Sequence, residues 1–158
     1  MPKFLTLKES YEKCLSDGSI IPQNQVDILK IESMLEIIKE DIESAKELKS
    51  KKETPWNTIY KLYYDALHTL AEALLRFDRI KSSNHQCLFS YLCTKHTELE
   101  LDWSFFEKVR TKRNGINYYG SKATSKDWKE IEVQLYLYIK ALTEAVEQKI
   151  RNFKHENF

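Results

Sequence analysis

The sequence of 158 residues predicts an all-α protein, an antiparallel bundle of five to six helices in a single domain spanning residues 1–158. Three observations support this fold class. Only 3 glycines and 3 prolines are present, so the chain lacks most of the turns that an all-β fold needs. Apolar residues recur at spacings of three and four, which is the period of a buried helix face. Helix-capping residues precede several of these segments, and the connections between them are short.

The first two helices are expected near residues 5–15 and 25–49. Asp17-Gly18 should end the first helix, because glycine readily adopts the left-handed conformation that follows a helix. Asn24 is the expected N-cap of the second helix. Its apolar residues form a heptad-like stripe that predicts one narrow buried face: Ile28, Ile31, Leu35, Ile38, Ile42 and Ala45.

A third helix is expected over residues 55–78. Thr54 is its predicted N-cap and Pro55 its first helical residue, where a missing N–H costs nothing. Tyrosines, leucines and alanines form a wide apolar face along this segment. Asp65 and Glu72 lie on the opposite side, where we expect them to face water.

Three more helices complete the predicted bundle. Ser83 and Gln86 have the spacing of a capping box, which predicts a helix over residues 84–97. A helix over residues 101–119 should end at the glycine that follows it. A last helix, residues 125–152, again carries a heptad-like apolar stripe. We expect no β-sheet.

The overall charge excludes one class of function. Twenty-five basic residues almost balance 24 acidic ones, so binding of nucleic acid through a strongly basic surface, regardless of sequence, is not expected. No apolar run approaches the roughly 18 residues of a membrane-spanning helix. The first residues also lack the apolar run of a signal peptide. We therefore expect a cytoplasmic protein with no membrane partner.

The three cysteines, Cys14, Cys87 and Cys93, are odd in number and show no CxxC spacing. A disulfide framework is not expected on this basis, and a reducing compartment fits better. His85 and His96 lie near two of these cysteines, but the spacing matches no structural zinc pattern. Buried free thiols beside surface or capping histidines explain the group better. We expect no metal and no cofactor.

The fifth predicted helix places Arg110, Arg113 and Asn117 within the sector that its large apolar residues mark as buried or half-buried. An unpaired guanidinium is costly to bury, so these side chains need partners. In one interpretation, the arginines lie at the rim and pair with carboxylates of a neighbouring helix. In the other, they line a cleft for an anionic ligand or contact a second subunit.

The polar residues crowded near the end of this helix favour the second interpretation. Arginine forks and amides suit phosphate oxygens and base edges, and tyrosine rings suit base stacking. Seven such residues fall within three turns: Arg110, Lys112, Arg113, Asn114, Asn117, Tyr118 and Tyr119.

The segment from Arg113-Asn114 to Gly120 resembles the signature of HEPN domains, the nucleotide-binding family of higher eukaryotes and prokaryotes. In that family an arginine, often followed by a polar residue, precedes a histidine by four to six residues near the end of a late helix. Arg113-Asn114 matches the first half of the motif. The helical architecture and the position before a last long helix match over roughly residues 25–150.

The second half of the motif differs, because Tyr118 stands where the catalytic form of the family has histidine. The resemblance implies an RNA- or nucleotide-binding module, a degenerate metal-independent RNase or a toxin–antitoxin-type protein that pairs with a nucleotidyltransferase. It also implies a homodimer, and the apolar stripes and aromatic content of 12% provide surface for one. A tyrosine, with an ordinary pKa of about 10, is a poor base near neutral pH.

We therefore expect binding without efficient cleavage. Arg113 and Tyr118 occupy the catalytic positions of the motif, and Arg110, Asn114, Asn117 and Tyr119 are expected to bind ligand. His68 would replace the missing histidine as a general base if it approached this helix. The alternative is a helical protein-assembly module in which Arg110 and Arg113 form structural ion pairs.

Overall fold

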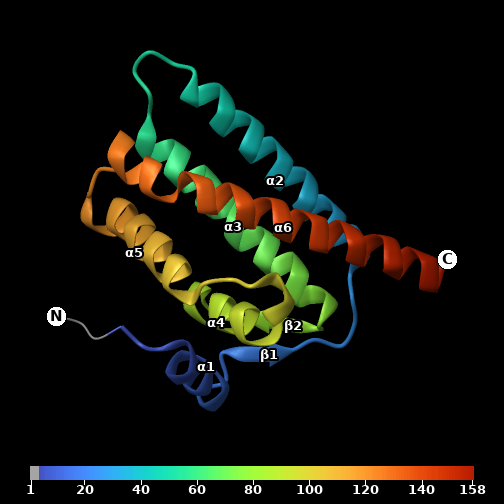
Figure 1. Ribbon diagram of the computed structural model, residues 1–158. Helices are drawn as coiled ribbons and strands as arrows, with labels where there is room; N and C mark the ends of the chain where they lie inside the picture. Colours follow the sequence, from blue (N-terminus) through green and yellow to red (C-terminus); the bar gives the residue numbers. More distant parts are fainter. Residues whose placement is uncertain (1–3) are drawn as a thin grey trace.

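The computed structural model describes residues 4–158 and confirms the all-α fold class (Figure 1). Long helices form the body of the molecule, and a short two-stranded sheet and the first helix lie at one end of it. The elements are α1 (Leu7–Ser16), β1 (Ile20–Pro22), α2 (Ile28–Lys49), α3 (Trp56–Phe77), β2 (Ile80–Ser82), α4 (His85–Lys95), the 3₁₀ turn η1 (Thr97–Leu99), α5 (Trp103–Tyr119) and α6 (Ser125–Asn157).

Helix α3 is the centre of the bundle and packs against α2, α4, α5 and α6. Its apolar face is wide because tyrosine, leucine and alanine side chains recur on successive turns, and eleven of its 22 residues are buried. The predicted stripe of α2 is also buried within the chain at its central positions, including Ile31, Ile38 and Ala45. That stripe is therefore used to build this bundle and is not available as a surface for a second copy.

A two-stranded antiparallel sheet contradicts the expectation of no sheet. β1 pairs with β2 in a register that places Ile20 opposite Ser82 and Pro22 opposite Ile80. Strands of three residues are too short to show an alternating pattern in the sequence. The pairing holds together two segments that are distant in the sequence, one leading into α2 and the other into α4, as Figure 1 shows.

Three predicted helix caps are wrong by one to three residues. α2 begins after Asp27, whose carboxylate accepts from the Lys30 N–H, and not after Asn24. α4 is capped by Asn84, whose side-chain oxygen accepts from the Cys87 N–H, instead of by Ser83. At α3 the N-cap is Pro55, and the Thr54 hydroxyl donates backward to the Lys51 carbonyl. At α2 and α4 the true caps lie further along the chain than predicted, and the side chain of each accepts from the N–H three residues later.

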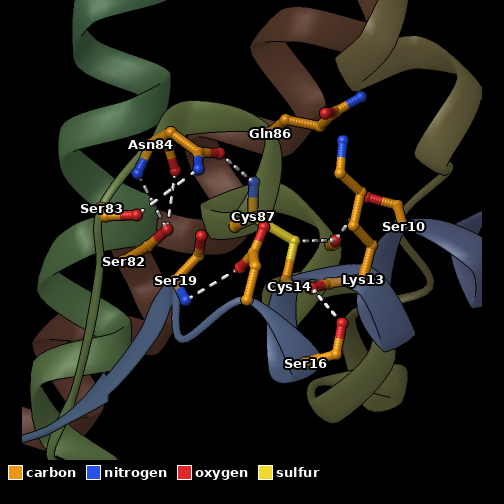
Figure 2. The surroundings of a disulfide bond; sticks show 12 residues. Ser10, Lys13, Cys14, Ser16, Ser19, Ser82, Ser83, Asn84, Gln86 and Cys87 are labelled. Atoms are coloured by element: carbon orange, nitrogen blue, oxygen red, sulfur yellow. Dashed lines mark hydrogen bonds between the residues drawn. A yellow bond between two sulfur atoms is a disulfide. The ribbon is translucent and has the colours of Figure 1, made fainter.

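Helix α1 is joined to α4 by a disulfide between Cys14 and Cys87, which corrects the expectation that these cysteines are free thiols (Figure 2). Their Cα atoms lie 5.7 Å apart although 73 positions separate them in the sequence. Ser10 and Ser90 share a buried hydrogen bond of 3.0 Å beside it. Packing of α1 on α4 thus creates a pair that the spacing of the cysteines does not suggest. The cysteine content therefore no longer supports a reducing compartment.

Cys93 and His96 are the other cysteine and histidine of this region, and both side chains are buried. Cys93 is a buried free thiol, as expected. His96 is the C-cap of α4, so the expected capping position is confirmed, but its side chain is buried and not on the surface. His96 Nε2 lies 2.6 Å from an Asp78 carboxylate oxygen at the end of α3, and the Tyr91 hydroxyl donates to the same oxygen. The hydrogen bond to Asp78 is the main reason that the pKa of His96 is raised.

None of the helices in residues 4–158 has the length and apolar character required to cross a bilayer.

We predict that the disulfide contributes about 4 kcal/mol to the free energy of unfolding, because it closes a loop of 73 residues in the unfolded chain. Urea unfolding of the oxidised protein with and without reductant measures this difference. A variant carrying both Cys14→Ser and Cys87→Ser is the control, and its free energy of unfolding should not change when reductant is added. Equal stability of the parent under both conditions would contradict the prediction.

We also predict that the His96–Asp78 pair stabilises the fold in a pH-dependent way. Because the pKa of His96 is raised in the folded state, its contribution is fully present below about pH 6.5 and is lost as the pH rises through the raised value. His96→Gln should lower the free energy of unfolding by about 1–3 kcal/mol at pH 6 and by less at pH 9. The matched control is His155→Gln at an exposed position of α6. A pH-independent difference would refute this assignment.

Candidate functional site

The last two turns of α5 carry the predicted site. Asp102 caps the start of the helix, and Phe105, Phe106 and Val109 bury one face against the bundle. The helix ends after Tyr119, and Gly120 adopts the left-handed conformation with φ of 66°. This end agrees with the prediction and fixes the direction in which the polar residues project.

A pocket of about 470 Å³ lies between α1, the start of α4 and the end of α5. Four of the six predicted site residues line it, namely Arg110, Arg113, Asn114 and Tyr118. Asn117 and Tyr119 are exposed and lie outside its lining. The pocket also contains residues from the other two helices: Lys13, Cys14, Asp17, Ser83, Asn84, His85, Gln86 and Cys87. Figure 2 shows the wall in which the disulfide lies beside Lys13 and Asn84.

Arg110 is held by a carboxylate of its own helix. Its Nε and one terminal nitrogen donate to the two oxygens of Glu107 at 3.0 and 2.9 Å. Glu107 is buried, with 5% of its surface exposed, and it accepts a further bond from the Gln86 side chain. Arg110 therefore neutralises a buried carboxylate, but this partner lies on α5 itself and not on a neighbouring helix as the ion-pair interpretation expected. The sequence analysis did not identify Glu107 as its partner. Lys112 likewise pairs with Asp127, at 3.2 Å.

Arg113 has no comparable partner. One terminal nitrogen lies 4.0 Å from an Asp65 oxygen, at the limit for an ion pair. The guanidinium carbon lies 5.3 Å from the centre of the Tyr64 ring, which is a cation–π distance. Its Nε is buried and makes no hydrogen bond within residues 4–158. Arg113 thus retains N–H donors in a pocket where a phosphate or carboxylate would satisfy them.

His85 is a residue of this pocket that the sequence analysis did not connect with Arg113. It is the first residue of α4, and its Nδ1 lies 3.0 Å from the Tyr64 hydroxyl. Burial is the largest cause that lowers the pKa of His85 to about 4, and the neighbouring His68 and Arg113 lower it further. The imidazole is therefore neutral near pH 7.

His68 contacts two carboxylates of its own helix, α3. Its two ring nitrogens lie 3.3 Å from Glu72 Oε1 and 3.6 Å from Asp65 Oδ1. These two carboxylates keep 43% and 41% of their side-chain surface exposed, so they reach water as expected while they also contact His68. The His68 ring stacks on the His85 ring with centroids 4.3 Å apart. His68 therefore reaches the pocket only through His85, which lines it together with Arg113.

Comparison with known protein families, with curated proteins and with solved structures finds no match to this chain.

We predict that the His85 titration reports the charge of Arg113. In an NMR titration the His85 ring should protonate at a pKa of about 4, and Arg113→Ala should raise this value because a neighbouring positive charge is removed. The control Arg151→Ala lies on exposed α6 surface outside this pocket and should change nothing.

The lowered pKa of His85 also makes the free energy of unfolding depend on pH. Between about pH 4 and 6.5 the unfolded chain binds a proton at His85 that the folded chain does not, so stability falls as the pH falls through this window.

For the NMR titration, an unchanged His85 pKa in Arg113→Ala would show that the two side chains do not interact.

Proposed function

We propose that this protein binds a phosphate-bearing ligand, RNA or a nucleotide, in the pocket between α1, α4 and α5. The observation that carries the proposal is the state of Arg113, which is half-buried and has a buried Nε without a partner in residues 4–158. A structural arginine in this environment normally has its donors satisfied, as those of Arg110 are. Phosphate oxygens accept from a guanidinium fork in the required geometry.

The other pocket residues support a ligand of this chemical class. Lys13 and Arg113 add positive charge, which exceeds the single negative charge of Asp17 once Arg110 is neutralised by Glu107. The Asn114 amide lines the same pocket. Tyr118 is 72% exposed at the pocket edge, where its ring is free to stack on a base.

The resemblance of the Arg113 segment to the HEPN motif points to the same ligand class. Within that proposal we favour binding without efficient cleavage of RNA. With Tyr118 in the place of the motif histidine, the usual general base is missing, and the pKa of about 4 makes His85 a weak one. A toxin–antitoxin setting with a nucleotidyltransferase partner is part of the same proposal.

The alternative function, protein assembly, draws on two observations. The bidentate Arg110–Glu107 pair is the kind of structural ion pair that this alternative expects. Large apolar side chains are also exposed on α2 and α6, including Ile37, Val133 and Leu137, which are 54%, 72% and 60% exposed. We propose these side chains, in place of the buried α2 stripe, as the surface of a homodimer.

We predict that Arg113→Ala weakens binding of a short single-stranded RNA by about 10–100-fold, the range expected for loss of a charge-assisted hydrogen bond. Fluorescence anisotropy at fixed low salt measures the dissociation constant, and circular dichroism verifies that the variant is folded. Arg151→Ala removes the same charge from exposed α6 surface and should change binding by less than about threefold. The proposal fails if the two variants bind alike, or if the parent does not bind RNA or mononucleotides.

A further inference from the structure

His68, Glu72 and His85 form a cluster outside the residues that the motif predicts. His68 and Glu72 lie one turn apart on α3, and His85 begins α4. Each residue offers one metal-ligating atom, and the three atoms lie within 4.8 Å of one another. All three residues are half-buried. This position reduces competition from water while leaving access for an ion.

The spacing of the first two ligands suits a tetrahedral ion. His68 Nδ1 lies 3.3 Å from Glu72 Oε1. Zinc binds nitrogen and oxygen at about 2.0–2.2 Å, so two of its ligand atoms stand roughly 3.3 Å apart. This side-chain pair is therefore already at the separation that one shared ion requires.

The remaining ring nitrogens have the partners that metal-binding histidines usually have. His68 Nε2 lies 3.6 Å from Asp65 Oδ1, and His85 Nδ1 lies 3.0 Å from the Tyr64 hydroxyl. Such contacts fix which nitrogen carries the proton. When His85 donates from Nδ1 to Tyr64, the lone pair of its Nε2 is free to bind an ion.

A simple ion pair, with protonated His68 between Asp65 and Glu72, accounts for only part of the cluster. It does not involve the His85 ring, which stacks on His68 with centroids 4.3 Å apart and offers a ligand atom within 4.8 Å of those of His68 and Glu72. A neutral imidazole is the form that binds metal ions. Arg113 lies nearest to Asp65, so Glu72 keeps its charge for an ion. Arg76 is close enough to Glu72 to oppose this in part.

We propose that His68, Glu72 and His85 bind one divalent transition-metal ion of the zinc class. Two nitrogens and one carboxylate oxygen form a three-ligand set that leaves a fourth position open. A metal ion lies in the plane of an imidazole, so the His85 ring turns out of the stacked arrangement when the ion binds. This site does not rest on the proposed RNA or nucleotide function and departs from the expectation of no metal.

The test uses the full oxidised chain, treated with a chelator and then freed of it. Calorimetric titration with Zn²⁺ should show one ion per chain. Co²⁺ should give visible absorption bands of a four- or five-coordinate site without a thiolate charge-transfer band. His85→Ala and Glu72→Gln should each weaken Zn²⁺ binding by more than about 100-fold, and Tyr64→Phe by about tenfold. The control, His155→Ala, should bind as the parent does.

Several results would overturn the proposal. They are the absence of saturable binding at millimolar Zn²⁺, undiminished binding by Glu72→Gln, or a thiolate band that disappears in Cys93→Ser. Circular dichroism verifies the fold of each variant. Should His85→Ala unfold, the nearly isosteric Glu72→Gln decides the question.

Discussion

Burial of α3 on almost all sides is the constraint on which the rest of the structure depends. Four other helices pack around it, and large side chains such as Tyr63, Leu67 and Leu74 are almost fully buried. Each such side chain contributes about 1.5–3 kcal/mol. A helix enclosed in this way has little room for polar groups. Its carboxylates Asp65 and Glu72 and the histidine between them follow one strip at spacings of three and four.

That strip meets α5 at Arg113, and the contrast with Arg110 shows how position determines the role of an arginine. The two residues lie one turn apart on the same helix, and both are half-buried. Arg110 has an ideally placed carboxylate, Glu107, three residues earlier. The residue three before Arg113 is Arg110 itself, so Arg113 must find its partners on α3, where it reaches Tyr64 and only the edge of Asp65. Arg113 lines the pocket, and its buried Nε is left without a hydrogen bond among residues 4–158.

The sequence was sufficient to predict the helices, because buried faces repeat over many turns, and to predict the crowded end of α5. It could not predict the features that depend on contacts between distant segments. The disulfide joins residues 73 positions apart, and the two strands of the sheet, β1 and β2, have three residues each and are far apart in the sequence. His85 showed no signal of its own, because it reaches Arg113 only when α4 starts beside the end of α5. A search for carboxylate and histidine at i, i+4 on one predicted helix would have identified His68 and Glu72.

His85 belongs both to the Arg113 pocket and to the His68–Glu72 cluster, so the two proposed sites cannot be independent. An ion at the cluster adds positive charge near Arg113, which favours a phosphate in the pocket. It also draws the His85 ring toward α3, which removes a pocket residue. Because coupling between two ligands is reciprocal, the factor by which Zn²⁺ changes RNA binding equals the factor by which RNA changes Zn²⁺ binding. Its sign depends on whether added charge or loss of the ring dominates. If each ligand strengthens binding of the other, the ion and Arg113 act on the phosphate together. If each ligand weakens binding of the other, the two compete for the His85 imidazole.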